Sequence, residues 1–131
     1  METTGRHLLC EYHGCDAQIL GDPARLEALL QQAAAAAGAT VVHSVTHRFA
    51  ALGVSGVLLL EESHLSIHTW PERGYAAVDF YTCGACQPQR AHQVMLDGLR
   101  AERAEVLVVD RGGPEGIRVR PGAQNPNPIL K

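Results

Sequence analysis

The stretch 64–70 alternates polar and apolar side chains with a period of two, and this pattern constrains the fold most strongly. On a strand, Leu65 and Ile67 would point to one face of a sheet. The other face would carry His64, Ser66, His68 and Trp70. A polar, titratable face of this kind is either a solvated surface or a site, and the pattern alone leaves both open.

Further strands are expected over 6–13, 40–49, 54–61, 75–81 and 105–110, with 57–60 apolar enough to be buried on both faces. A helix should begin with Asp22 as N-cap and Pro23 in the first turn, and end at Gly38. Gln87 and Pro88 open a second helix. Two helices among strands that are neighbours in sequence predict an α+β fold. We expect a two-layer sandwich, a largely antiparallel β-sheet with two helices on one face.

The 131 residues suit one small domain, expected over 1–111. Glycine and proline punctuate 112–131, which predicts a mostly irregular C-terminal tail. A net charge of −3 with scattered basic residues gives no sign of nucleic-acid binding. No apolar run approaches membrane-spanning length, and the first residues do not resemble a signal peptide, so a cytoplasmic protein is expected.

Four cysteines leave a second class of function open. Cys83 and Cys86 form a C-x-x-C motif, and together with Cys10 and Cys15 they could bind zinc in a non-enzymatic module. The gap between Cys10 and Cys15 is wider than the usual zinc knuckle.

Several motifs together resemble the prokaryotic S-adenosylmethionine decarboxylase proenzymes, a self-cleaving family that uses a pyruvoyl group. The main motif is Ser63-His64-Leu65-Ser66-Ile67-His68-Thr69-Trp70-Pro71-Glu72. The others, in order along the chain, are Gly5-Arg6-His7-Leu8, Gly53-Val54-Ser55-Gly56-Val57, Tyr75-Ala76-Ala77-Val78-Asp79 and Thr82-Cys83-Gly84. The resemblance implies the same sandwich fold. It also implies a homodimer of cleaved protomers with active sites near the interface, and no pyridoxal phosphate or metal.

The resemblance also implies how the chain is processed. The Ser63 hydroxyl attacks the Glu62 carbonyl, the peptide becomes an ester, and β-elimination separates a β chain, 1–62, from an α chain that begins at 63. Ser63 becomes the pyruvoyl group, which forms a Schiff base with the substrate amine. His68 is the expected proton acceptor in processing, and Ser55 supports it. Without the resemblance, Ser63 would be read as a turn residue and His68 as a structural histidine.

Three further residues match the family's positions for catalysis and substrate binding. Cys83 would donate the proton that replaces the lost carboxylate. Phe49 would stack on adenine, and Glu72 would bind the ribose hydroxyls. Their ordinary readings are a small buried thiol, a core aromatic residue and a solvated acid.

The chain departs from the family near the site. Arg73 stands where the family usually has tyrosine, and Cys86-Gln87-Pro88 replaces an Asp-Pro-Trp segment. Cys86 has no clear counterpart. These changes leave open an arginine or ornithine decarboxylase that uses the same machinery. Phe49 and Glu72 favour S-adenosylmethionine, whose decarboxylated product donates the aminopropyl group in spermidine synthesis.

Overall fold

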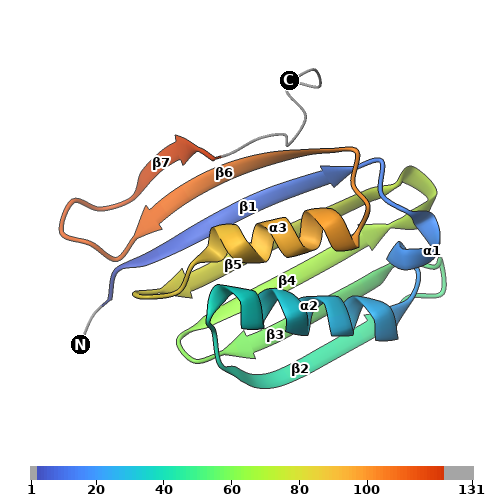
Figure 1. The fold of residues 1–131 in the computed structure, drawn as a ribbon, viewed down its shortest axis with the longest axis horizontal. Coiled ribbons are helices and arrows are strands. Elements are labelled where there is room, and N and C mark those ends of the chain that lie inside the picture. The colour runs from blue at the N-terminus through green and yellow to red at the C-terminus, as the bar shows by residue number, and fades with distance from the viewer. Residues whose placement is uncertain (1–2, 123–131) are drawn as a thin grey trace.

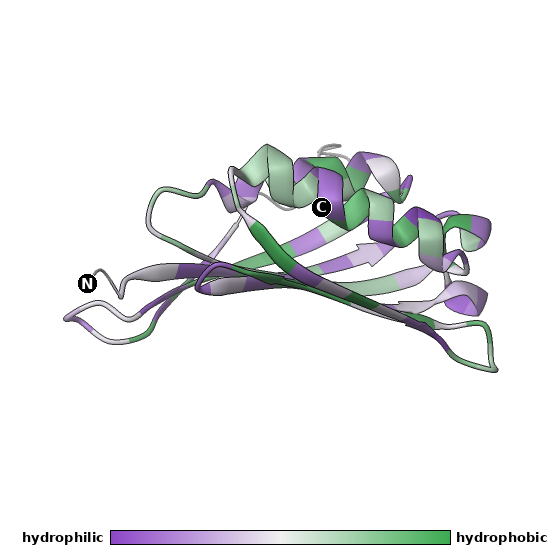
Figure 2. Ribbon diagram, turned by 90° about the horizontal axis from the view of Figure 1, so that it is seen from below, coloured by the Kyte–Doolittle hydropathy of each residue, from purple (hydrophilic) through white to green (hydrophobic). Residues whose placement is uncertain are grey.

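In the computed structural model, which describes residues 3–122, the chain forms one antiparallel sheet with helices on a single face (Figures 1 and 2). The spatial order is β2-β3-β4-β5-β1-β6-β7. The strands are β1 (Gly5–His13), β2 (Val41–Arg48), β3 (Val54–Leu60), β4 (Ser63–Trp70), β5 (Tyr75–Cys83), β6 (Arg103–Arg111) and β7 (Arg118–Pro121). β1 is the first strand in the chain but pairs with both β5 and β6. The N-terminal segment therefore lies in the interior of the sheet.

Two long helices, α2 (Pro23–Ala37) and α3 (Pro88–Gly98), pack side by side across the sheet (Figure 1). The Asp22 carboxylate accepts a hydrogen bond from the Arg25 N–H at 3.2 Å, and Gly38 ends α2 with a φ of 81°. Asp22 therefore caps the start of α2 and Gly38 ends the helix, as the sequence predicts. The short helices are α1 (Ala17–Leu20), capped by Asp16, and the 3-10 turn η1 (Pro71–Arg73).

The core lies between the helices and the sheet. Alternate residues of each central strand point into it, such as Leu65 and Ile67 on β4 and Leu8 and Cys10 on β1. Ala33, Ala34 and Ala37 are buried on α2, where small side chains allow the helix to approach its neighbours closely. No helix in residues 3–122 is long and apolar enough to cross a membrane.

Within residues 3–122, no further layer covers the opposite face of the sheet (Figure 2). It exposes polar groups together with the large apolar residues Leu9, Val45, Val57, Leu59, Trp70, Leu107 and Val119. The prediction that 57–60 is buried on both faces is wrong: Leu58 and Leu60 are buried, but Val57 is 41% and Leu59 53% exposed. In the described part of the chain, helices cover one face of the sheet, so every second residue of β3 points away from the core. We call this surface the bare face.

The predicted strands and the two long helices are confirmed, with small shifts at their ends. Three features differ. The segment after β1 contains the single-turn helix α1, and residues 71–74, between two predicted strands, contain η1. The predicted irregular tail contains β7, which pairs with β6 from Leu107 to Asp110 because that strand would otherwise leave its edge unpaired. Residues 123–131 of that tail lie outside the described part of the chain.

Candidate functional site

The hairpin between β3 and β4 contains an unfavourable backbone turn. Leu60 pairs with Ser63, so the loop consists of Glu61 and Glu62. Favoured two-residue hairpin turns have a positive φ at the first loop residue, or at both. Here the first is not positive, and the second, Glu62, has a φ of 59°. A non-glycine residue in this region costs about 1–3 kcal/mol, and this strain lies at the peptide bond that precedes Ser63.

Ser63 lies at the start of β4 and points to the helix side, where it is buried. Its hydroxyl donates a hydrogen bond to the Glu61 carbonyl oxygen at 3.1 Å. The hydroxyl is therefore held against its own turn, beside the Glu62–Ser63 peptide.

Cys83 ends β5 at the same end of the sheet as Ser63. His64 pairs with Tyr81, so continuing this antiparallel register places Ser63 beside Thr82, the residue before Cys83. Ser63 and Thr82 both face the helices and are buried. Cys83 points to the other face and is partly exposed. Ser63, Cys83 and the strained turn form what we call the serine end of the site.

The other predicted residues gather in one pocket near the opposite end of β4. Phe49, Ser55, His68 and Glu72 line this pocket together with Trp70. The Ser55 hydroxyl and His68 Nδ1 are hydrogen-bonded at 2.8 Å. Phe49 is 49% and Trp70 41% exposed. Two accessible aromatic rings and a carboxylate suit a flat ring that carries hydroxyl groups. We call this the aromatic pocket.

Trp70 is a pocket residue that sequence reasoning placed only on a strand face. It stacks on Tyr75 with ring centroids 5.2 Å apart. The Tyr75 hydroxyl donates to the Glu11 carboxylate at 2.7 Å, and burial together with this bond raises the pKa of Tyr75 to about 12. Neighbouring strands thus hold the ring against which Trp70 rests.

The serine end and the aromatic pocket do not meet within one chain. His68 follows Ser63 by five residues on a single strand, which corresponds to about 17 Å at the usual rise per residue. Their side chains also point to opposite faces of the sheet. His68 therefore cannot reach Ser63 of its own chain in this conformation.

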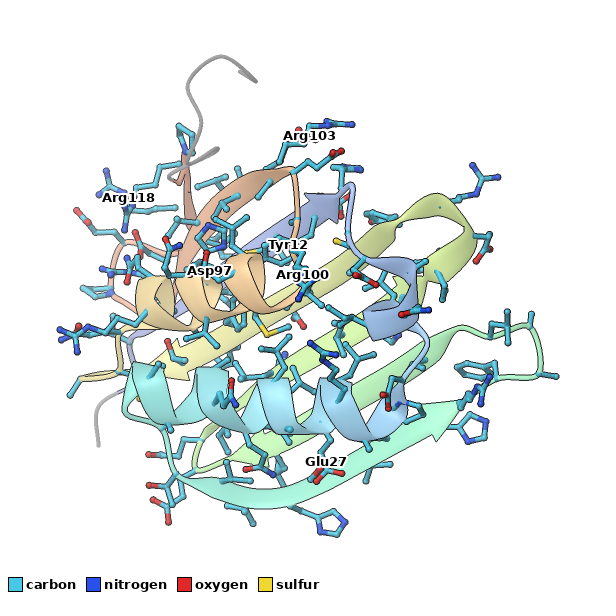
Figure 3. The ribbon with its side chains drawn as sticks, turned by 45° about the vertical axis from the view of Figure 1, so that its right-hand side comes forward. Tyr12, Glu27, Asp97, Arg100, Arg103 and Arg118 are labelled. Carbon is cyan, nitrogen blue, oxygen red and sulfur yellow. The ribbon has the colours of Figure 1, made fainter. Side chains whose placement is uncertain are left out.

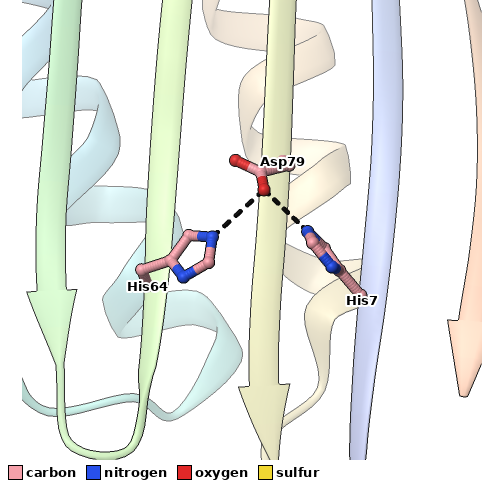
Figure 4. A group of neighbouring side chains, drawn as sticks. All are labelled: His7, His64 and Asp79. Atoms are coloured by element: carbon pink, nitrogen blue, oxygen red, sulfur yellow. Dashed lines mark hydrogen bonds and ion pairs between the residues drawn. The ribbon is translucent and has the colours of Figure 1, made fainter. Parts of the chain in front are cut away.

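A cluster of titratable groups on the bare face was not predicted as a unit. The Asp79 carboxylate bonds His7 Nε2 at 2.6 Å and His64 Nε2 at 3.1 Å (Figure 4). It also accepts a hydrogen bond from the Ser66 hydroxyl. Burial alone would raise the pKa of Asp79, but the bonds from His7, Ser66 and His64 outweigh it and hold this pKa well below its usual range. The residues come from β1, β4 and β5, so no local spacing in the sequence could reveal the group.

The same three side chains, His7, His64 and Asp79, are close enough to ligate one cation. However, the Arg111 guanidinium lies 3.2 Å from His7 Nδ1, which must therefore accept, while Nε2 carries the proton and donates to Asp79. A metal on Nε2 would reverse this tautomer and turn an N–H of His7 toward the N–H of Arg111. The geometry fits a hydrogen-bonded cluster better than a metal site.

The zinc-module hypothesis is wrong for the described structure. The cluster of His7, His64 and Asp79 is the one group of suitable ligands found in residues 3–122, and it contains no cysteine. Cys10 lies five residues along β1 from Gly5, the partner of Cys83, or about 17 Å away. The four thiols cannot surround one ion.

Comparison with known proteins gives consistent matches over most of the chain. The sequence model of the S-adenosylmethionine decarboxylase family matches residues 6–112. The S-adenosylmethionine decarboxylase proenzyme of Thermotoga petrophila is 46% identical over 120 residues, covering 91% of this chain and 92% of that protein. The corresponding proenzyme of Bacillus velezensis is 44% identical over 119 residues, covering 90% and 94%.

A solved structure agrees with these matches. The crystal structure of the adenosylmethionine decarboxylase from Aquifex aeolicus superposes with a TM-score of 0.76 at 38% identity, covering 86% of this chain and 94% of that one. The α+β sandwich expected from the sequence is confirmed. The chain belongs to the S-adenosylmethionine decarboxylase family.

Proposed function

We propose that this protein is a self-processing, pyruvoyl-dependent decarboxylase of S-adenosyl-L-methionine. The observation that carries the proposal is the strained Glu62 turn before Ser63, in a chain of this family. Its products are carbon dioxide and S-adenosylmethioninamine, the aminopropyl donor for spermidine. We place the enzyme in the cytoplasm, which suits four cysteines that are all free thiols.

Ser63 fits the role of pyruvoyl precursor. Its hydroxyl lies beside the peptide that it must attack, and the attack relieves strain at Glu62. The ester that forms is then eliminated when a base removes the Ser63 α-proton. His68 is the proposed base, with Ser55 orienting its imidazole through their 2.8 Å hydrogen bond. The pyruvoyl group would accept the electrons that are left when the bond between the substrate α-carbon and its carboxylate breaks.

Substrate binding and the final proton transfer use other side chains. Phe49 and Trp70 offer ring faces to adenine, and Glu72 offers its carboxylate to the ribose hydroxyls. The Cys83 thiol donates the proton that takes the place of the departed carboxylate. Cys83 ends the strand next to Ser63 and points to the bare face, which supports this role if a partner covers that face.

The separation of the two halves of the site supports a homodimer. A second copy packed on the bare face about a two-fold axis would lay its aromatic pocket over the end of the first sheet that carries the Glu62 turn and Cys83, whose side chain points to this face. The exposed apolar residues of this face, such as Leu9, Val57 and Leu59, would then be covered. Each site would take Ser63 and Cys83 from one chain, and His68, Phe49 and Glu72 from its partner.

The identity of the substrate is tested by incubating the processed enzyme with carboxyl-labelled S-adenosylmethionine, arginine or ornithine. The measured quantity is the carbon dioxide released from each. We expect release from S-adenosylmethionine alone. Glu72→Gln should raise KM for it by about tenfold while leaving kcat within a few-fold, because a carboxylate that binds the ribose contributes ground-state binding. Release from arginine or ornithine, with none from S-adenosylmethionine, would overturn the substrate and keep the chemistry.

A further inference from the structure

The C-x-x-C motif forms a tight turn between β5 and α3. The Cys86 N–H donates to the Cys83 carbonyl oxygen at 3.2 Å, and Gly84 has a φ of 46° that a β-turn of this kind needs. The ends of a β-turn lie within about 7 Å of each other, and disulfides join Cα atoms about 4.4–6.8 Å apart. The turn therefore holds the Cα atoms of Cys83 and Cys86 at a spacing that a disulfide can span once the two side chains rotate toward each other.

Both thiols of this turn can be reached from solvent. Cys83 and Cys86 are partly exposed, and Cys86 lines a surface hollow with Arg6, Thr82 and Gly84. The Cys86 Sγ has only a weak contact with the Gly38 carbonyl oxygen, at 3.8 Å. Burial raises the pKa of Cys86, and the nearby Cys83 thiol raises it further.

The other two cysteines, Cys10 and Cys15, differ from this pair in their access to solvent. Cys10 and Cys15 are buried in the core, and burial raises the pKa of each to about 12. Thiols of this kind form little thiolate and are shielded from oxidants. Any thiol chemistry of the folded protein should therefore concentrate on Cys83 and Cys86.

We propose that Cys83 and Cys86 form a reversible disulfide that switches decarboxylation off. The inference rests on the proposed role of Cys83, since a disulfide removes the thiol proton that Cys83 would donate. Cys86, which has no part in the proposed reaction, becomes the resolving cysteine. The oxidant is a low-molecular-weight disulfide, and a dithiol reverses the reaction.

The Cys83–Cys86 disulfide would form by two successive thiol–disulfide exchange steps, each an attack by a thiolate. The Cys83 thiolate attacks one sulfur of the oxidant, forms a mixed disulfide and releases one thiolate. The Cys86 thiolate then attacks the Cys83 sulfur of the mixed disulfide and releases the second. The two protein thiols lose two electrons and two protons, and the oxidant leaves as two thiols.

Trypsin places the two cysteine pairs on separate peptides, which gives a direct test. Cleavage after Arg73 and Arg90 yields peptide 74–90 with Cys83 and Cys86, and cleavage after Arg6 and Arg25 yields peptide 7–25 with Cys10 and Cys15. The folded Ser63→Ala chain is treated with glutathione disulfide, quenched with N-ethylmaleimide under denaturing conditions and digested. We expect peptide 74–90 to be two hydrogens lighter and unalkylated, with peptide 7–25 fully alkylated. Alkylation of both peptides, or a glutathione adduct on 74–90, would overturn the proposal.

Turnover of the processed enzyme provides the second readout. Oxidation should reduce turnover by about a hundredfold or more, in proportion to the disulfide found, and dithiothreitol should restore it. Cys86→Ser should have normal basal turnover and never form the lighter peptide. Full turnover of the disulfide form would overturn the switch. The peptide measurement uses an uncleaved chain, so it does not depend on the proposed function; Cys83→Ala separately tests the role of Cys83, because it should lose turnover without any oxidant.

Discussion

At the scale of single residues, Glu62 has a strained backbone and also contributes the carbonyl group that Ser63 is proposed to attack. Glycine adopts a positive φ without strain, so Glu62→Gly should stabilise the uncleaved chain by about 1–2 kcal/mol. If that strain is released in the attack by Ser63, self-cleavage should slow by about tenfold. The rate of chain splitting after synthesis measures this.

Glu61→Gly is the matched control for that variant. Glu61 is the other loop residue, and it does not have a positive φ. The substitution should leave the splitting rate within about threefold, because it relieves no strain. Equal rates for Glu62→Gly and the unmodified chain would show that the turn contributes nothing to cleavage.

Asp79 organises a polar cluster on the bare face with His7, His64 and Ser66. Asp79→Asn should lower the free energy of unfolding at neutral pH by about 1–3 kcal/mol. The reason is that it removes the negative charge of the carboxylate to which both His7 and His64 are bonded. The pKa of Asp79 is depressed in the folded state, so its contribution is present above the unfolded pKa of about 4 and lost as pH falls below it.

Denaturant unfolding at several pH values tests this effect. The difference between Asp79→Asn and the unmodified chain should shrink below about pH 4. Glu105→Gln, on the same face but with a 68% exposed side chain, should change stability little at any pH. A difference for Asp79→Asn that persists unchanged into acid would contradict the assignment.

At the scale of elements, β1 and α3 are joined by a buried pair of polar side chains. Tyr12 lies where β1 passes beneath α3 (Figure 3), and its hydroxyl and His92 Nδ1 are hydrogen-bonded at 2.7 Å. Tyr12→Phe leaves this nitrogen without that partner and should cost about 1–3 kcal/mol of stability.

The same pair predicts a pH dependence. Burial lowers the pKa of His92, and the nearby Asp97 only partly opposes this. A depressed pKa means that His92 contributes stability above its unfolded pKa of about 6.5 and loses it as pH falls through the folded value. Stability should therefore fall more steeply below about pH 6.5 in the unmodified chain than in His92→Gln. Equal slopes would remove His92 from this role.

Most elements could be predicted because their signals are local. Asp22, Pro23 and Gly38 define α2 within a few neighbouring residues, and strict alternation defines β4. β7 and the Asp79 cluster could not be predicted, since each depends on partners brought together by the sheet rather than by spacing. The double burial expected for 57–60 failed for a related reason: an apolar run does not reveal whether a second layer belongs to the same chain.

At the scale of the whole molecule, the sequence motif predicted the site residues but not their separation into two groups. Ser63 and His68 stand in one motif, yet on one strand they lie too far apart to react together. The proposed roles of Ser63 and His68 therefore need two copies of the chain that complete each other's sites.

Mixed dimers test this arrangement. Ser63→Ala and His68→Ala chains should each remain uncleaved when produced alone. Produced together, they should yield cleaved His68→Ala chains, because the partner's intact histidine reaches Ser63. Adding Leu59→Asp to both should abolish the effect by placing a charge on the apolar bare face, where Leu59 is 53% exposed. Cleavage of the His68→Ala chain by itself would contradict the shared site.

Self-cleavage at Ser63 is tested by the intact mass of the freshly purified, untagged chain under denaturing conditions. We expect two fragments: 1–62, and a 63–131 chain lighter by one ammonia than its serine form. Ser63→Ala should give one full-length mass. A single full-length mass from the unmodified chain, or a 63–131 fragment that begins with intact serine, would contradict the formation of a pyruvoyl enzyme.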